Sequence, residues 1–547
     1  MKSFPIRRWD RQSTLVGQIT AGISLLTLLV YLRHNDLLLY GDAVAHMNIA
    51  RRVFDSRTPG LLQLGTVWLP LPHIFMLPFV ISDAAWRTGI GGAVPSMVGY
   101  VLGTVGIFRL VCGALSSLDS FDSSSRLAAW LAAAIYAANP NLMYMQSTAM
   151  TETLYLAWFI WALVHFGEFV RDANSAAQAG NRSLIRCGVC LAGASLTRYD
   201  GWFLTGILCV AVAAVVAKYG RGNAPLRRAF AKFVLLAAAA PAFWLAYNAI
   251  AYRNPLEFAN GPYSAKAIEE RVSNPGVQSY PGLHDPSVAF AYFFKAAEQM
   301  LGEGNWQRPW VVLLVAGTLL ILWRVRKCWP VLFVWVPLPF YVLSIAYGSV
   351  PVYLPEWWPH AYYNVRFGLE LLPAFVVFTA IGSSFLLNRA RGQTAKTATV
   401  VGLVAFVAGS YMFVWRAQPI CFREAWANGQ SRIALETEVA RTLSLLPHNS
   451  TVLMYLGNHV GALQDGGIPL RRTINEGNHR SWIKPTDSEG LWERALANPE
   501  AYADYVVAID DDPVSRAVNR ANLTSMVVIR TQGQLPATIF WTHRDER

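Results

Sequence analysis

Long runs of apolar residues, separated by short polar or basic stretches, recur along the first three quarters of the chain. A helix of about 17–25 such residues crosses the hydrocarbon core of a bilayer. Two of the runs, 126–139 and 183–197, are short for a crossing. The pattern predicts about eleven transmembrane helices, near 14–33, 93–113, 126–139, 152–170, 183–197, 201–218, 229–250, 308–325, 330–347, 366–388 and 398–416.

Residues 66–82 are also apolar, but prolines at 70, 72 and 78 interrupt them. Proline removes a backbone donor and breaks a regular helix, so this segment is predicted to be interfacial or re-entrant rather than a crossing. The preceding stretch, "YGDAVAHMNIARRVF" at 40–54, has the pattern of an amphipathic interfacial helix.

Basic stretches indicate which side of the membrane each end of a helix faces. If the N-terminus is cytoplasmic, the segments 171–186, 218–228, 324–327 and 388–396 all lie inside, as the positive-inside rule requires. An odd number of crossings then leaves the C-terminus outside. The polar and aromatic segments collect on the outer face, which predicts a site at the outer water–lipid boundary. The expected location is the bacterial inner membrane.

From about residue 420 the pattern changes to strands alternating with helices. Helices are predicted at 423–446 and 491–500, and strands at 451–457, 505–510 and 525–531. Strands alternating with helices predict a small α/β fold. The chain is therefore divided into a membrane domain, 1–420, and an extracytoplasmic α/β domain, 421–547.

Composition agrees with a multi-pass membrane protein. Of the 547 residues, 54% are hydrophobic and only 15% are charged, against about 25% in soluble proteins. The formal charge of +12 is assigned to basic loops, because no nucleic-acid-binding motif accompanies it, and no nucleic-acid partner is expected. The six cysteines form no disulfide framework, and Cys187 and Cys190 are interpreted as packing residues inside an apolar segment.

Asp42, just outside the first crossing, is the first candidate for chemistry. An acid in this position is ordinarily a helix cap. A carboxylate at the membrane surface is also well placed to take a proton from an acceptor hydroxyl, or to hold a metal that does related work.

Here the sequence resembles the GT-C glycosyltransferases, polytopic enzymes that use polyprenyl-phosphate-linked sugars. "YGDAVAHMNIARRVFDS" and "GTVWLPLPHIFMLPF" are similar to the corresponding segment of bacterial relatives of the dolichyl-phosphate-mannose protein mannosyltransferases and of the lipid A aminoarabinose transferases. "MTETLYLAWF" (150–159), "LTRYDGW" (196–202) and "YNVRFGLELLPAF" (363–375) resemble later segments. The resemblance covers roughly residues 10–420.

The resemblance implies transfer of one sugar from a polyprenyl-phosphate carrier to an acceptor at the outer face, with inversion and with Asp42 as base. The acceptor, a protein, a lipid or a polysaccharide, is not determined. Many relatives carry a second acid next to the first, where this chain has Ala43. No metal ligands are therefore assigned, and a requirement for a divalent metal stays open.

Further candidates follow from position and chemistry and, for Glu152 and His73, from the resemblance, which implies that they lie near the acceptor or the site. Arginine suits phosphate because its planar fork is permanently charged. Each candidate also has a structural explanation, such as an aromatic belt, a helix cap or an ion pair between neighbours. The donor phosphate or sugar is expected to contact His46, Arg198, Tyr362, Tyr363 and Arg366, and the acceptor or cavity to include His73, Glu152 and Asp200.

Other readings stay open. A transporter or lipid-linked-sugar flippase is the alternative function; it predicts repeated halves and ionisable groups near mid-membrane. The long segment 251–307 is expected to be a lid or binding loop. "IDDDP" (509–513) resembles a metal-binding acidic motif, but Asp512 before Pro513 favours a helix cap. "NEGNHR" (475–480) is expected to be a loop that could face the membrane site.

Overall fold

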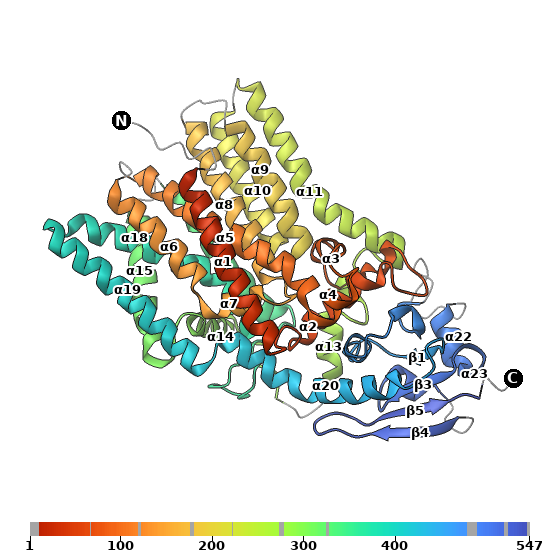
Figure 1. Cartoon of the computed structure of the whole chain (residues 1–547). Helices are drawn as coiled ribbons and strands as arrows, with labels where there is room; N and C mark the ends of the chain where they lie inside the picture. The colour runs from red at the N-terminus through yellow and green to blue at the C-terminus, as the bar shows by residue number, and fades with distance from the viewer. Residues whose placement is uncertain are drawn as a thin grey trace.

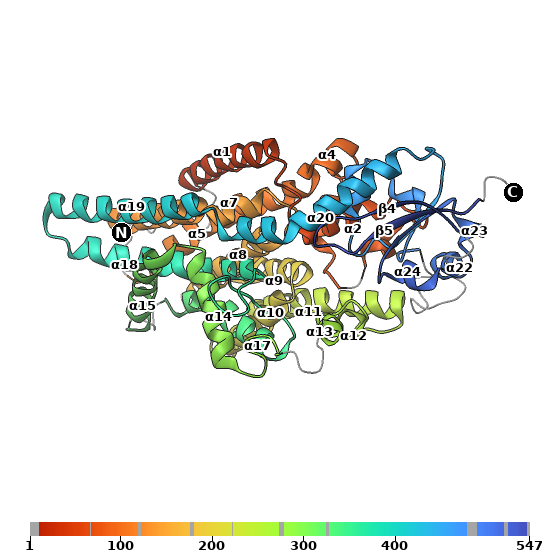
Figure 2. The ribbon, with the colours of Figure 1, turned by 90° about the horizontal axis from the view of Figure 1, so that it is seen from below.

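The chain folds into a helical bundle with a small α/β domain at one end (Figures 1 and 2). Helices form where the apolar runs predict them, because in a bilayer a helix satisfies its own backbone hydrogen bonds. The structure is a computed structural model and describes residues 10–65, 67–118, 122–174, 180–220, 222–272, 278–323, 328–478, 490–518 and 523–543.

All eleven predicted runs are helical over most of their described residues. The expected basic segment 324–327 and part of 171–186 lie outside the described residues. The long helices of the bundle are α1 (Arg11–Arg33), α5 (Ile90–Leu118), α6 (Ser123–Ala137), α8 (Glu152–Asn174), α9 (Gly180–Thr197), α10 (Asp200–Tyr219), α11 (Ala224–Tyr252), α15 (Gln307–Trp323), α17 (Pro337–Tyr347), α18 (Leu372–Arg389) and α19 (Gly392–Ala417). The 3₁₀ helices η3 (Trp329–Trp335) and η4 (Val365–Leu371) lead into α17 and α18.

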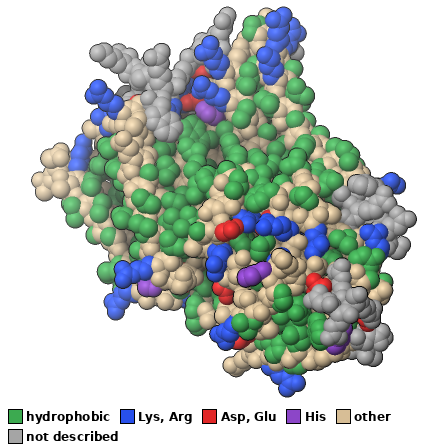
Figure 3. All heavy atoms as spheres, turned by 45° about the vertical axis from the view of Figure 1, so that its right-hand side comes forward, with side chains coloured by type: hydrophobic (Ala, Val, Ile, Leu, Met, Phe, Trp, Pro, Cys, Tyr) green, Lys and Arg blue, Asp and Glu red, His purple; other side chains and the backbone are tan. Residues whose placement is uncertain are grey.

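Within the described residues, nine helical segments are long and apolar enough to cross a membrane. The two missing from that set are α6 and α9, which correspond to the runs predicted to be short. The protein is therefore a multi-pass membrane protein, and the count of eleven crossings stays a prediction. Figure 3 shows the broad hydrophobic surface of the bundle, with charged side chains gathered toward its two ends.

Helices α5, α8 and α18 form the centre of the bundle. Helix α5 packs against α1, α6 and α8, and α8 packs against α9. Most of α5 and nearly all of α18 are buried, whereas one face of α1 is exposed. The ends of α8, α10 and η4 nearest the C-terminal domain carry the buried charges described below.

Glycine sets the spacing between α15 and α18. A Cβ added at Gly317 of α15 would stand 2.1 Å from the backbone oxygen of Phe378 in α18. Two helix backbones approach this closely only where a side chain is absent.

We expect Gly317→Ala to destabilise the protein by about 1–3 kcal/mol, because the new methyl group forces the two helices apart. The measurement is the free energy of unfolding in detergent. Gly206→Ala in α10 is the matched control, since a Cβ there meets nothing within 4 Å. Alanine favours a helix over glycine, so the control should be neutral or slightly stabilising. Equal effects of the two substitutions would contradict close packing at Gly317.

Short elements lie between the bundle and the C-terminal domain. The proline-interrupted segment contains only the short helix α3 (Leu71–Met76), followed by α4 (Asp83–Thr88). Helix α2 (Gly41–Arg52), predicted to be an amphipathic interfacial helix, is buried on most sides, packed against α3, α5 and the 3₁₀ helix η1 (Leu61–Leu64). The C-terminal domain also contacts it, and Asn48 of α2 donates a hydrogen bond to Gln464.

The described residues of the segment 251–307, which is predicted to be a lid or binding loop, include three α-helices and a 3₁₀ helix. It contains α12 (Glu257–Asn260), α13 (Ala265–Val272), α14 (Pro286–Gln299) and the 3₁₀ helix η2 (Gly304–Trp306). Helix α14 packs on α17 and η4 through buried residues such as Phe293, so this half belongs to the core. Its cap, Asp285, accepts bonds from the amides of Ser287 and Val288.

The C-terminal domain begins with α20 (Ile420–Ser444), which packs on α7 (Pro140–Gln146) and η4. A five-stranded mixed sheet follows, in the order β2-β1-β3-β5-β4. Strand β1 is parallel to β2 and β3, and β5 is antiparallel to β3 and β4. The strands are β1 (Val452–Met454), β2 (Thr473–Ile474), β3 (Tyr505–Ile509), β4 (Thr524–Ile529) and β5 (Ala537–Trp541).

The remaining helices of this domain are short. Trp492, Val506 and Phe540 belong to a separate hydrophobic core on one side of the sheet. The predicted helices and three strands are present, and β2 and β5 were not predicted. The helices are α21 (Gly461–Asp465), the 3₁₀ helix η5 (Leu470–Arg472), α22 (Leu491–Ala497), α23 (Pro499–Tyr502) and α24 (Pro513–Ala517).

Candidate functional site

A cavity of about 1130 Å³ lies between the end of the helix bundle and the C-terminal domain. The bundle side comes from α2, the stretch 58–68, the region from Tyr252 to Ile268, and the turn from Tyr363 to Phe367. The C-terminal side comes from the loops 455–460, 476–477 and 511–516. The cavity is therefore built from segments more than 400 residues apart in the sequence.

Asp42 lies in the first turn of α2 and lines this cavity. Its side chain is 41% exposed, and its Oδ2 accepts a hydrogen bond of 2.6 Å from Nη2 of Arg366. Tyr40, at the N-cap, makes no capping bond with its side chain. Asp42 is therefore not the N-cap residue of α2. Its carboxylate faces open space beside the guanidinium of Arg366.

Arg366 connects Asp42 to buried acids behind it. Its Nη1 lies 3.3 Å from Glu424 Oε1, its Nε lies 3.3 Å from Glu152 Oε1, and its backbone amide donates to Glu424 Oε2. Tyr40 donates a further bond of 3.0 Å to Glu424. The Arg366 side chain is 11% exposed and contributes to the cavity wall. Each of its three guanidinium nitrogens contacts a carboxylate, so the group is held in a fixed position beside Asp42.

Arg198 forms a second, deeper layer. Its Nη1 lies 3.2 Å from Glu152 Oε1, and its Nε lies 3.4 Å from Asp200 Oδ2. Tyr341 accepts a bond from Arg198 and donates one of 3.0 Å to Asp200. Glu152 therefore bridges the two arginines, because its Oε1 accepts from both.

Acids outnumber arginines in this cluster. Glu152, Asp200, Glu370 and Glu424 are all buried against two guanidiniums. Glu370 Oε1 is 3.7 Å from Arg198 Nε, and neither of its oxygens has a hydrogen-bond partner among the described residues. Of the acids in this cluster, Asp42 alone is open to the cavity.

His46 of α2 pairs with His73 of α3. His46 Nδ1 lies 2.8 Å from His73 Nε2, and the His46 ring lies 4.6 Å from the ring of Trp68, tilted by 47°; Trp68 lines the cavity. Burial, aided by the charges of Arg198 and Arg366, lowers the pKa of His46 to about 3. Burial, aided by His46, also lowers the pKa of His73 well below its usual value. Both rings are therefore neutral at physiological pH, and the contacts of His46 are with His73 and Trp68.

The buried pair His46 and His73 predicts that the free energy of unfolding decreases at acidic pH. Below about pH 6.5 the unfolded chain binds protons at both imidazoles and the folded chain does not. Each histidine therefore removes up to about 1.4 kcal/mol of stability per pH unit below that value, and none above it. We expect His73→Gln, whose amide can still bond to His46, to reduce this slope between pH 6.5 and 5.5 in chemical unfolding. The exposed His448→Gln should keep the wild-type slope; a wild-type slope in His73→Gln would contradict the prediction.

The structure brings many of the predicted site residues together, in three groups. Asp42, Tyr363 and Arg366 line the cavity. Glu152, Asp200 and Arg198 support Arg366 from behind, and His46 of α2 pairs with His73 of α3. Tyr362 is outside the cavity lining; its ring packs against the hydrophobic core and its carbonyl accepts a bond from Asn428.

Sequence reasoning missed several residues. Glu424 lies in a helix with ordinary polar periodicity, so nothing in the pattern marked it. Glu370 was detectable, because an acid inside an apolar run is rare and usually functional. Arg52 and Glu476, 3.8 Å apart, lie on opposite walls of the cavity.

The two C-terminal motifs, 509–513 and 475–480, both contribute residues to the cavity. Asp512 caps α24, accepting from the amides of Ser515 and Ile509, as the cap interpretation predicted. It also lines the cavity, as do Asp511 and Glu476. The second motif is therefore a loop that faces the membrane site; its last two residues, 479–480, are outside the described part. No cluster of three or more His, Cys, Asp or Glu residues suited to a metal ion occurs in the described ranges.

Comparison with solved structures identifies the fold. ArnT from Cupriavidus metallidurans bound to undecaprenyl phosphate superimposes with a TM-score of 0.58 and 14% identity, over 96% of this chain and 97% of ArnT. Its apo form gives 0.56, with 14% identity over 96% and 98%. An oligosaccharyltransferase from Archaeoglobus fulgidus, in complex with Zn and sulfate, gives 0.50 at 12% identity, over 96% of this chain and 72% of the other.

These likenesses confirm the predicted GT-C fold, a polytopic helical bundle with an α/β domain after it. No family model matches the chain. No curated protein matches it either.

Proposed function

We propose that this protein is a membrane glycosyltransferase that moves a sugar from a polyprenyl-phosphate carrier to an acceptor. The observation that carries the proposal is Asp42, a carboxylate open to a large cavity and in contact with an arginine suited to phosphate. The fold shared with ArnT, which binds undecaprenyl phosphate, supports this class of donor.

The cavity is large enough for two substrates. Pockets for single small molecules usually measure about 300–1,000 Å³, and this one exceeds that range. Leu61 and Leu62 line it with side chains that are 63% and 38% exposed. Exposed apolar side chains at this edge suit the lipid tail of the donor, and the charged depth of the cavity suits its phosphate and sugar.

The geometry supports a single displacement. Asp42 accepts the proton of the acceptor hydroxyl as that oxygen attacks the anomeric carbon. The bond between that carbon and the phosphate oxygen breaks, and the polyprenyl phosphate leaves with the electron pair. Attack opposite to the leaving group inverts the anomeric configuration. Arg366 stabilises the negative charge on the leaving phosphate, because its position is fixed before the reaction by Glu152 and Glu424.

We assign the acceptor to the C-terminal side of the cavity. Tyr455, Asn458, Glu476 and Asp511 present an aromatic ring, an amide and carboxylates there, groups that bind hydroxyl-rich molecules. In a steady-state transfer assay, Tyr455→Ala should raise the KM for the acceptor about tenfold or more with little change in the KM for the donor. A rise in the KM for the donor alone would instead place the donor on the C-terminal side of the cavity.

The function is tested with purified protein in lipid vesicles. A panel of radiolabelled polyprenyl-phosphate sugars is supplied together with an extract of cell-envelope acceptors, and the release of polyprenyl phosphate is measured. We expect one donor to be consumed. If none is consumed by a folded protein, the proposal fails, and movement of lipid-linked sugar across the vesicle becomes the next assay.

The position of the charged cluster favours the transferase over the transporter. The cluster lies at the starts of α8, α10 and η4, not at mid-helix as a transport path requires.

A further inference from the structure

Tyr341 of α17 is buried and does not line the Asp42 cavity, yet its hydroxyl contacts two charged side chains. The hydroxyl accepts a hydrogen bond of 3.0 Å from Nη2 of Arg198 and donates one of 3.0 Å to Oδ2 of Asp200. A buried hydroxyl costs free energy unless it is hydrogen-bonded, and a phenylalanine would fill the same space without that cost. The hydroxyl of Tyr341 therefore does more than fill the core.

Two aromatic rings hold Tyr341 in place. Its ring stacks on Phe293 of α14 at 4.7 Å, with an angle of 16° between the planes. It also lies 5.1 Å from the ring of Phe367 in η4. Because the ring is packed against two different elements, the hydroxyl has a fixed position from which to orient its partners.

Phe367 supports both arginines of the cluster. The Cζ atoms of Arg198 and Arg366 each lie 5.2 Å from the centre of its ring. A guanidinium within about 6 Å of an aromatic ring is attracted to the face of that ring. The two guanidiniums therefore share one aromatic support, and that support contacts Tyr341.

Each guanidinium nitrogen of Arg198 has a partner in the cluster. Nη2 donates to Tyr341, Nη1 lies 3.2 Å from Oε1 of Glu152, and Nε lies 3.4 Å from Oδ2 of Asp200. Arg198 does not line the Asp42 cavity. Its effect on a bound donor therefore passes through Glu152.

Glu152 connects Arg198 to Arg366. Its Oε1 lies 3.2 Å from Nη1 of Arg198 and 3.3 Å from Nε of Arg366. One oxygen that accepts from two guanidiniums fixes their separation, so a shift of Arg198 is passed to Arg366. Arg366 in turn contacts Asp42 at 2.6 Å, where the transfer is proposed to occur.

We propose that Tyr341 is a positioning residue for sugar transfer. Its hydroxyl orients Arg198, and through Glu152 this sets the guanidinium of Arg366 against the leaving phosphate. The inference rests on the proposed function, because it takes Arg366 as the group that binds the phosphate of the donor.

The test is Tyr341→Phe, which removes one oxygen atom and keeps the ring. Negative charge on the phosphate grows as the bond to the sugar breaks, so a misplaced Arg366 should affect kcat more than KM. We expect kcat to fall about tenfold, with the KM for the donor changed by less than about twofold. Undecaprenyl phosphate carries the full charge of the leaving group, and its binding in native mass spectrometry should weaken about tenfold.

The binding measurement needs neither a sugar nor an acceptor, so it separates this inference from the proposed function. If the wild type binds undecaprenyl phosphate but transfers no sugar, only the proposed function fails. If the wild type does not bind it, both proposals fail. Equal binding by the wild type and Tyr341→Phe would overturn the positioning role alone.

Tyr411→Phe is the matched control. Tyr411 is also buried, and its hydroxyl also donates one hydrogen bond and accepts another, but its partners are the carbonyl of Ile135 and the amide of Asn139, which are uncharged. The control should shift the midpoint of chemical unfolding as much as Tyr341→Phe does, yet keep wild-type kcat and binding. An equal loss of kcat in both variants would show that Tyr341 is merely structural.

A pair of double variants tests the route through Glu152. Glu152→Gln weakens the link between the two arginines, so Tyr341→Phe should reduce kcat by less than about twofold further in that background. Additive losses would overturn the route.

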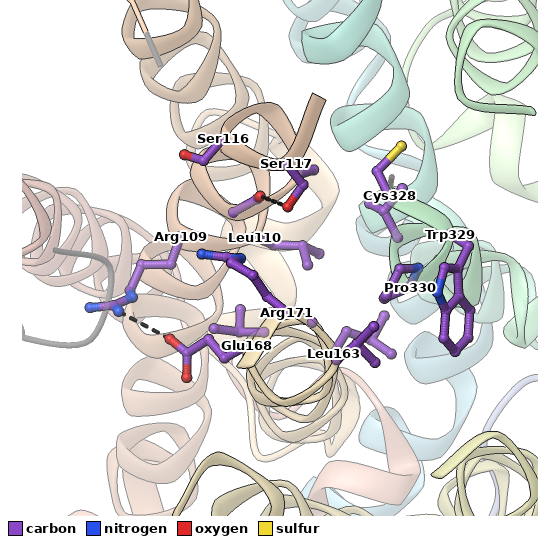
Figure 4. Close-up of a pocket in the computed structure, with 16 residues that line it drawn as sticks. Arg109, Leu110, Ser116, Ser117, Leu163, Glu168, Arg171, Cys328, Trp329 and Pro330 are labelled. Carbon is purple, nitrogen blue, oxygen red and sulfur yellow. Dashed lines mark hydrogen bonds and ion pairs between the residues drawn. The ribbon is translucent and has the colours of Figure 1, made fainter. Parts of the chain in front are cut away.

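Glu168→Gln provides the control background. Figure 4 shows Glu168 paired with Arg109 at 3.4 Å, beside a smaller cavity of about 380 Å³. Glu168 is on the same helix as Glu152, but sixteen positions later, or about 24 Å at about 1.5 Å per residue. Glu168→Gln should keep wild-type kcat, and Tyr341→Phe should have its full tenfold effect there. A reduced effect in this background as well would contradict a specific connection through Glu152.

Discussion

Asp42→Asn is expected to reduce sugar transfer by about a thousandfold, within the range that a general base contributes. Asparagine keeps the shape of the side chain, and its carbonyl oxygen still accepts the bond from Arg366. It cannot take up the proton of the acceptor hydroxyl. The measurement is the rate of release of polyprenyl phosphate from the donor identified with the wild type.

The control for this substitution is Asp83→Asn. Asp83 is also in the first turn of a short helix and pairs with an arginine, Arg51, but its side chain is 77% exposed and does not line the cavity. It should keep wild-type activity. Both variants should unfold at the wild-type temperature. If Asp42→Asn retains more than about a tenth of the activity, Asp42 is not the base.

Arg366→Met is expected to destabilise the folded protein by about 3–5 kcal/mol. The arginine is paired with Glu424, Glu152 and Asp42, and the first two of these are buried. Methionine preserves most of the volume but leaves two buried carboxylates without their shared partner. The measurement is the free energy of unfolding in detergent, and the substitution should also abolish transfer.

Two further variants show whether the loss comes from uncompensated charge. Arg441→Met breaks an ion pair with Glu438 in which both side chains are exposed, so it should cost no more than about 1 kcal/mol. Adding Glu424→Gln to Arg366→Met removes one of the stranded charges and should recover part of the stability. If the double variant is less stable than Arg366→Met, the charge cluster does not explain the loss.

Much of the bundle could be predicted from the sequence, because the length of an apolar run is a local property. The runs at 14–33 and 398–416, for example, became α1 and α19 with boundaries shifted by only a few residues. Helix α14 also has a local signal, because Asp285 caps it and Pro286 follows. However, the surrounding segment 251–307 was judged too polar to contain a buried helix.

The cluster around the site could be predicted only in part. Asp42 and Arg366 were each marked by their chemistry at a helix start, but 324 residues separate them, and periodicity contains no information on such a pairing. His46 was expected to contact the donor phosphate or sugar. The structure pairs His46 with His73 from another element, since a buried imidazole takes whichever partner the tertiary fold places beside it.

The helix bundle and the C-terminal domain both contribute residues to the Asp42 cavity, and this limits how the protein can evolve. Glu424, at the start of the C-terminal domain, is a partner of Arg366, and Glu476 faces Arg52 from the other wall. The two parts are therefore not interchangeable modules. A chimera that joined this bundle to a different C-terminal domain would leave Arg366 or Arg52 without its carboxylate unless the new domain supplied an acid at the same place. Substitutions on one side of this junction therefore require matching substitutions on the other.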